Sequence, residues 1–222
     1  MRYYPICLNI TNKRCVVAGG GEVGARKTTT LLDCGARVTV IGRTLLPSLE
    51  MLRREDRISH VKADYEPAHL EGAFLVIGAT DSHTVNEKIF TDARLRGILV
   101  NIADAPQLCD FILPAVVRRG DLLLAVSTGG QSPALASKLR KELESSYGAE
   151  YADLLEIMGK LRQQRLSCGF TPEENKRFFT ALIESDILRH IGEGNEKGVA
   201  ACLGEIAALA NEAGTSKDKG KD

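Results

Sequence analysis

Three consecutive glycines between a strand-like run and a helix-like segment place the strongest constraint on the fold of this chain. Residues 16–27 read VVAGGGEVGARK, and Gly19, Gly21 and Gly24 fit the pattern G-x-G-x-x-G. The first glycine permits a tight strand-to-helix turn, the second lets a pyrophosphate approach the backbone, and the third allows close packing of helix on strand. The motif is weak alone, but here it follows a strand and opens a helix. It predicts a dinucleotide site at Gly19, Gly20 and Gly21, with a turn that binds nothing as the alternative.

Strand-like and helix-like segments alternate through the first half of the chain. Continuous apolar runs typical of buried parallel strands are interrupted by segments of helical spacing. The expected strands are 14–18, 37–41, 58–62, 73–78 and 98–102, and the expected helices are 23–34, 45–54 and 84–96. This order predicts an α/β fold of Rossmann type, with a parallel sheet covered by helices on both faces.

The pattern changes after about residue 105. Two more strands are expected at 110–114 and 122–127, and only helices after them, at 133–146, 151–166, 172–191 and 196–211. We therefore expect a nucleotide-binding domain over 1–113, a connecting region over 114–147, a small all-helical C-terminal domain over 148–212 and a disordered tail over 213–222.

Charge and cysteine usage exclude several classes of protein. The 222 residues carry 29 basic and 29 acidic side chains, so the basic excess of a nucleic-acid binder is missing. The six cysteines are scattered with no C-x-x-C pair, and the histidines show no metal-ligand spacing, so no metal site is expected. No apolar run approaches the roughly 18 residues of a membrane span. We expect no nucleic-acid partner, no membrane partner and a cytoplasmic location.

The acidic residue that usually follows the second strand of a dinucleotide fold is missing. That residue binds the ribose hydroxyls about 20 positions after the glycines. Here the chain reads Ile41-Gly42-Arg43-Thr44. Arg43 either faces the 2′-phosphate of NADP or is simply solvated, so these residues alone leave NAD and NADP open.

Two polar clusters follow the fourth and fifth expected strands, where ligands bind in open parallel sheets. The small residues Ala79 and Thr80 let a cofactor lie against the backbone. Asn101 and Asp104 belong to the second cluster, NIADAP, and we expect Asn101 to contact the substrate. A carboxylate at Asp104 can remove a proton while a hydride leaves; the alternative is an aspartate that only shapes the turn before Pro106.

A second glycine turn, STGGQSP, precedes the helix expected at 133–146. Its N–H groups at Gly129 and Gly130, together with the hydroxyls of Ser127 and Thr128, can hold a substrate carboxylate. An ordinary turn with a helix cap is the equal alternative.

These motifs together resemble one known family. The segments YYPICLNITNKRCVVAGGGEVGARK, GARVTV, FLVIGATD and VNIADAPQLCDFILPAVVRRGDLLLAVSTGGQSPALASKLRKELE look like those of precorrin-2 dehydrogenases, a module that also forms the N-terminal part of siroheme synthases. The resemblance is close over residues 1–145 and weaker to about 211.

The resemblance implies an activity, a cofactor and a partner. It implies NAD-dependent oxidation of the tetrapyrrole precorrin-2 to sirohydrochlorin, with Asp104 at the family's key aspartate. It implies cofactor contacts at Glu22, Val23, Arg43 and Thr44, and NAD although the acid is missing. It also implies a homodimer, with 114–147 as the dimerisation region.

Two alternative functions remain open beside this one. Some members of the family also insert Fe²⁺ into sirohydrochlorin, so a bifunctional enzyme is the first alternative. A non-catalytic nucleotide-sensing module, which shares only the first glycine turn, is a remoter one. At 222 residues we expect no room for the methyltransferase domain of the multifunctional enzymes.

Overall fold

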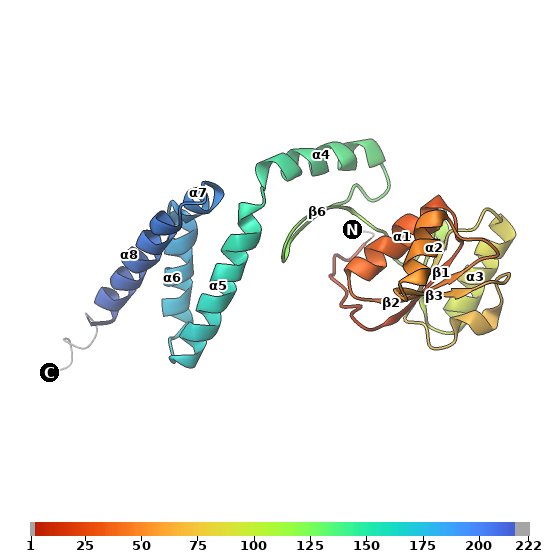
Figure 1. The fold of residues 1–222 in the computed structure, drawn as a ribbon, viewed down its shortest axis with the longest axis horizontal. Helices are drawn as coiled ribbons and strands as arrows, with labels where there is room; N and C mark the ends of the chain where they lie inside the picture. The colour runs from red at the N-terminus through yellow and green to blue at the C-terminus, as the bar shows by residue number, and fades with distance from the viewer. Residues whose placement is uncertain (1–2, 216–222) are drawn as a thin grey trace. The chain divides into compact units, whose positions relative to one another are not determined.

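The computed structural model describes residues 3–215 and divides the chain into two compact units, Met1–Leu113 and Pro114–Asp222. The first unit is built on a five-stranded sheet, and the second on a two-stranded sheet followed by helices (Figure 1). The expected α/β fold with a parallel sheet is confirmed.

All five strands of the first sheet run parallel, in the order β3-β2-β1-β4-β5. Their bounds are β1 Arg14–Ala18, β2 Arg37–Ile41, β3 Ile58–Val61, β4 Leu75–Gly78 and β5 Leu99–Ile102. The chain leaves β1 towards β2 and later returns beside β1 as β4. The order therefore reverses between β1 and β4, which is where dinucleotide folds bind their ligand.

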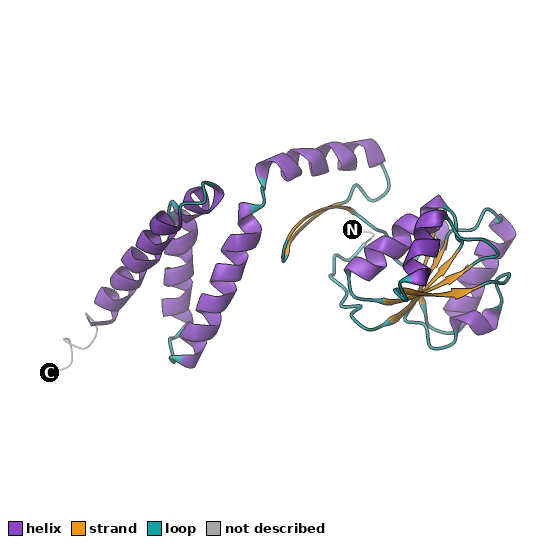
Figure 2. Ribbon diagram, in the orientation of Figure 1, coloured by secondary structure: helices purple, strands orange, loops and turns teal. Residues whose placement is uncertain are grey.

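Helices cover both faces of this sheet, because β1, β2 and β4 are apolar on both sides (Figure 2). On one face, α1 (Glu22–Asp33) and α2 (Pro47–Arg54) pack against side chains that include Val17 and Val40. On the other face, α3 (His83–Leu95) and the short 3₁₀ helix η1 (Pro67–Leu70) pack against a second core that includes Val76. A further 3₁₀ turn, η2 (Pro106–Leu108), follows β5.

The second unit begins with an antiparallel hairpin of β6 (Ala115–Arg119) and β7 (Leu122–Val126), on which α4 (Pro133–Ser146) packs. Four helices follow. They are α5 (Glu150–Ser167), α6 (Pro172–Glu184), α7 (Ile187–Gly192) and α8 (Glu196–Thr215). Their common core includes Leu154, Phe178 and Leu182.

Two expected elements are wrong, each for a local reason. No strand forms at 110–114; the strand begins after Pro114, because proline lacks the N–H that a ladder needs. The helix expected at 172–191 is two helices, since Ser185 is extended and its hydroxyl binds Leu182 O (2.8 Å) and Ile187 N (3.3 Å). Of the tail expected at 213–222, residues 213–215 belong to α8 and the rest lies outside the described residues.

Within residues 3–215, no helix is both long and apolar enough to cross a membrane. In the same range, no cluster of three or more histidine, cysteine or acidic side chains has the arrangement of a metal site.

Candidate functional site

The glycine turn after β1 is held between two neighbouring loops by backbone contacts. Gly19 has a φ of 122°, and a Cβ on it would lie 2.1 Å from Ala79 O, beyond β4. A Cβ on Gly20 would lie 2.1 Å from Thr44 O, beyond β2. Only glycine allows either approach. The structure thus brings Gly19, Gly20, Thr44 and Ala79 together at the carboxyl edge of the sheet.

The other two glycines of the turn differ sharply in their surroundings. A Cβ on Gly24 would lie 2.0 Å from Gly19 O, so this glycine lets α1 pack against the end of β1. A Cβ on Gly21 would meet no atom within 4 Å. The bare face of Gly21 is therefore open, as it must be if a pyrophosphate is to approach the backbone there.

The start of α1 presents hydrogen-bond donors beside this open face. The first bond of the helix runs from Ala25 N to Gly21 O (2.9 Å), so the N–H groups of Glu22 and Val23 precede it and point out of the helix end. The N-cap is Gly21, whose position gives no side-chain cap. These donors and the helix dipole favour an anion, so the residues present fit a dinucleotide pyrophosphate.

The loop after β4 is fixed by Asn86, a residue that the sequence did not single out. Its amide nitrogen donates to Thr80 O (3.0 Å), and its amide oxygen accepts from the Thr80 hydroxyl (2.8 Å). Asn86 is buried on α3. The hydroxyl of Thr80 is thereby committed within the loop, which leaves the backbone of Ala79 and Thr80 as the surface beside Gly19. The cap of α3 is Ser82, whose side chain accepts from Val85 N (3.3 Å).

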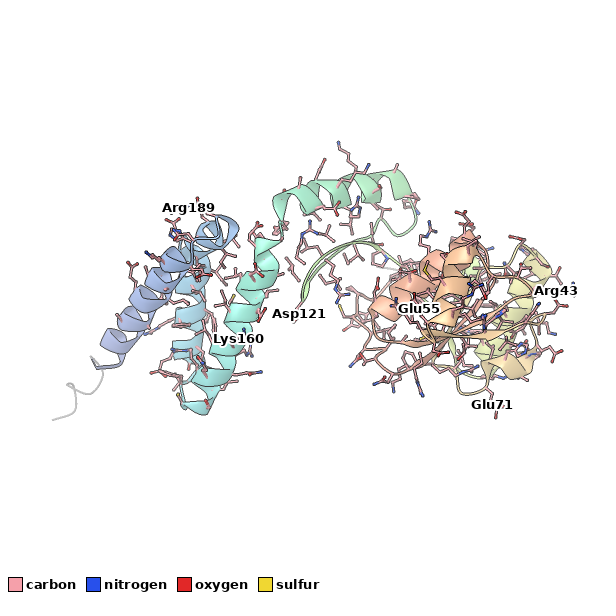
Figure 3. The ribbon with its side chains drawn as sticks, viewed as in Figure 1. Arg43, Glu55, Glu71, Asp121, Lys160 and Arg189 are labelled. Carbon is pink, nitrogen blue, oxygen red and sulfur yellow. The ribbon has the colours of Figure 1, made fainter. Side chains whose placement is uncertain are left out.

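Arg43 lies at the surface of the first unit, beyond β2 (Figure 3). Its guanidinium makes a two-pronged ion pair with Asp64, with Nε donating to Oδ1 at 2.7 Å and Nη2 donating to Oδ2. The bond and charge of Arg43 lower the pKa of the Asp64 carboxyl, and those of Asp64 raise the pKa of Arg43. Asp64 belongs to no sequence motif and was not predicted, because only the pairing of β2 with β3 brings it close to Arg43.

Asp104 lies in the turn directly after β5. Ala103 N donates to Gly78 O (2.8 Å), which ties this turn to the end of β4. Asp104 is exposed and has a φ of 59°, a left-handed conformation that is uncommon outside glycine. Such local strain is concentrated at functional sites. The carboxylate makes no hydrogen bond or salt bridge with the described residues, so it is free to act on a ligand.

Lys27 is a second residue that sequence reasoning missed. It lies half-buried on α1, close enough for its charge to interact with Asp104 and with the Cys109 thiol. Burial is the largest cause that lowers the pKa of Lys27, followed by Arg26, while Asp104 and Cys109 oppose that change. Its place one turn after Gly24 on α1 was the only available signal. The positive charge of Lys27 therefore acts on the Asp104 carboxylate.

Asn101 has a structural environment instead of an open one. The residue is buried, and its amide nitrogen donates to Phe111 O (2.9 Å) and contacts Cys109 Sγ (3.5 Å). Cys109 Sγ in turn accepts from Ile102 N (3.2 Å). Asn101 therefore holds the chain that returns past β5. Its expected contact with substrate stays a prediction.

The second glycine turn lies in the other unit and uses its hydroxyls internally. Ser127 Oγ accepts from Gly129 N (3.1 Å), and Thr128 Oγ1 accepts from Ser132 N (3.1 Å). Gly129 and Gly130 have φ values of 62° and 88°, which side chains rarely adopt. The hydroxyls of this turn therefore bond within the turn itself, and the substrate role of the four residues Ser127 to Gly130 stays a prediction.

Two family models match adjoining parts of the chain. A model described as "Putative NAD(P)-binding" matches residues 6–115, and one described as "Sirohaem biosynthesis protein central" matches residues 119–146. The first match contains the glycine turn, Asp64 and Asp104, and the second contains β7 and the second glycine turn.

Curated relatives and a solved structure agree with these models. The chain is 37% identical to a siroheme synthase of Methylobacillus flagellatus over 215 residues, 96% of this chain and 45% of that protein. It is 40% identical to a siroheme synthase of Nitrosomonas eutropha over 180 residues, 81% of this chain and 38% of that protein. The chain thus spans less than half of these relatives. Its fold matches the structure "SirC, precorrin-2 dehydrogenase" with a TM-score of 0.76 at 22% identity, covering 93% of this chain and all of the other.

Proposed function

We propose that the chain belongs to the NAD(P)-binding proteins of sirohaem biosynthesis, and that it oxidises precorrin-2 to sirohydrochlorin with NAD as the hydride acceptor. The observation that carries the proposal is that two groups follow parallel strands of the same sheet. One is the open face of Gly21, and the other is the carboxylate of Asp104, which makes no hydrogen bond or salt bridge with the described residues. The names of the relatives, siroheme synthase and precorrin-2 dehydrogenase, supply the substrate class.

Each group at this edge has a defined task. NAD, when bound, takes up a hydride. Gly21 and the N–H groups that open α1 bind its pyrophosphate, and the backbone at Ala79 and Thr80 forms the wall beside it. The oxidation removes a hydride and a proton from the macrocycle, and the Asp104 carboxylate accepts that proton. Lys27 places a positive charge beside the carboxylate.

We also propose that the protein works as a homodimer in the cytoplasm. The β6–β7 hairpin packs one face on α4, while Val116 and Leu123 on the opposite face are 39% and 48% exposed. An isolated hairpin is only marginally stable, and an exposed apolar face is typical of a surface that binds a partner. A second copy is the partner implied by the family resemblance. All six cysteines are free thiols, as is usual in a reducing compartment.

Incubation of the purified protein with precorrin-2 and NAD tests the function directly. We expect sirohydrochlorin and NADH to form together in equal amounts, followed by their absorption spectra. A folded preparation that binds NAD but forms no sirohydrochlorin refutes the proposed activity. Ferrous ion added to the same reaction then shows whether the protein also has the chelatase activity found in some members of the family.

A further inference from the structure

The adenosine end of the proposed NAD site lacks the acidic residue that normally follows the second strand. That acid binds the ribose 2′-hydroxyl in NAD-dependent folds, whereas an arginine nearby binds the 2′-phosphate of NADP. Here Arg43 stands at this place. The sequence alone leaves NAD and NADP open, because Arg43 either faces a 2′-phosphate or is simply solvated.

The structure brings an acid to Arg43 from the neighbouring strand. Asp64 lies three residues after β3, and its carboxylate accepts a bidentate pair of hydrogen bonds from the guanidinium of Arg43. The bond from Nε to Oδ1 is 2.7 Å long. The fork of arginine is the geometry that also binds a phosphate, so a carboxylate that occupies it competes with a 2′-phosphate. The side chains of Arg43 and Asp64 are 77% and 69% exposed, so the pair is open to a ligand.

Neighbouring residues hold the two loops in place. Gly42 N donates to Val61 O (3.1 Å), and His60 Nε2 lies 2.8 Å from Gly42 O, so the ends of β2 and β3 are bound to each other. Tyr65, next to Asp64, donates its hydroxyl to Asp92 Oδ2 (3.0 Å). The loop that carries Asp64 is therefore anchored on both sides of it.

We propose that Asp64, in the loop after β3, supplies the missing acid, and that it selects NAD over NADP by occupying the guanidinium of Arg43 that a 2′-phosphate would otherwise bind. This inference rests on the proposed function, because it assumes that a dinucleotide binds at the glycine turn. In the usual arrangement, one residue after β2 decides which cofactor binds. Here the ion pair of Arg43, after β2, and Asp64, after β3, takes that role.

Direct binding of NADH and NADPH, measured by calorimetry on the full chain, tests the proposal without any turnover. We expect the wild-type protein to bind NADH more tightly than NADPH. In Asp64→Ala, the affinity for NADPH rises about tenfold, because Arg43 is released to a 2′-phosphate. The double variant Asp64→Ala/Arg43→Ala loses this gain. Asp186→Asn breaks another exposed aspartate–arginine pair, with Arg189 at 3.0 Å, and leaves the preference unchanged.

Three results overturn the proposal. The first is a wild-type protein that binds both nucleotides equally, the second an Asp64→Ala variant that keeps the wild-type preference, and the third a gain for NADPH that persists without Arg43. A folded wild-type protein that binds neither nucleotide instead refutes the proposed function, and this inference with it. Urea unfolding of each variant distinguishes a change in binding from a loss of fold.

Discussion

Two glycines of the first turn allow the stability of the fold and the binding of the nucleotide to be tested by different substitutions. Gly19 and Gly21 are two positions apart, yet the structure gives them different tasks. Alanine at Gly19 must adopt a φ of 122° and places its Cβ 2.1 Å from Ala79 O. Alanine at Gly21 keeps an extended φ of −85° and ψ of −169° and meets nothing within 4 Å. Only the first change disturbs the fold.

The expected energies follow from these geometries. A strained backbone costs about 1–3 kcal/mol, and the shift needed to relieve an overpacked contact costs roughly another 1–3 kcal/mol. Gly19→Ala should therefore lower the free energy of unfolding by about 2–6 kcal/mol, a large share of the total stability of a domain. Gly21→Ala changes only an N-cap residue and should cost about 0.5–1 kcal/mol.

Nucleotide binding should show the opposite order. A methyl group at Gly21 stands where the pyrophosphate must approach the backbone, so Gly21→Ala should weaken NADH binding at least about tenfold, or about 1.4 kcal/mol. Urea unfolding and calorimetric titration with NADH measure the two quantities. Gly159→Ala is the matched control, because this glycine of α5 also has no neighbour within 4 Å. A folded Gly21→Ala protein with wild-type affinity would falsify the placement of the pyrophosphate.

Three further substitutions test the reaction, the charge beside it and the dimer. Asp104→Asn should retain NADH affinity but lower turnover of precorrin-2 at least about a hundredfold, since general bases contribute 10²–10⁴; unchanged turnover contradicts its role. Lys27→Met should lower turnover yet raise the urea midpoint at neutral pH. That gain should fade as pH rises through the lowered pKa of Lys27 towards 10.5, because the folded wild-type protein then no longer carries the buried charge. Leu123→Glu should yield monomers in light scattering, and a persisting dimer excludes the β6–β7 face.

Much of the first unit could be predicted because its buried strands are continuous apolar runs in the sequence. The strands expected at 14–18 and 37–41 have those bounds in the structure, since strands covered on both faces are continuous apolar runs. The start of helix α4 was also predicted correctly. Ser132 is its N-cap and accepts a hydrogen bond from Leu135 N (3.2 Å), and Pro133 lies in the first turn. Where a local hydroxyl or a proline competes with the regular pattern, as at Ser185 and Pro114, the prediction was wrong.

The predicted site was incomplete for a different reason. The glycine turn and Asp104 follow strands directly, so their position at the sheet edge can be read from order along the chain. Asp64 binds Arg43 across 21 positions, and the charges of Lys27 and Asp104 interact across an even longer separation. Such contacts depend on strand register and on which face of a helix is turned inwards, and neither is marked by residue type. Asn86 was missed likewise, because a buried amide looks like any other helical asparagine.

The strand order explains how one edge can serve the two ends of a dinucleotide. Asp64 follows β3 and Asp104 follows β5, the outer strands, while the glycine turn follows β1 at the centre. At about 4.8 Å between neighbouring strands, four spacings place the ends of β3 and β5 roughly 19 Å apart. Groups that far apart act independently unless they share a partner. Under the proposed function, we therefore expect cofactor choice at Asp64 and proton transfer at Asp104 to vary separately.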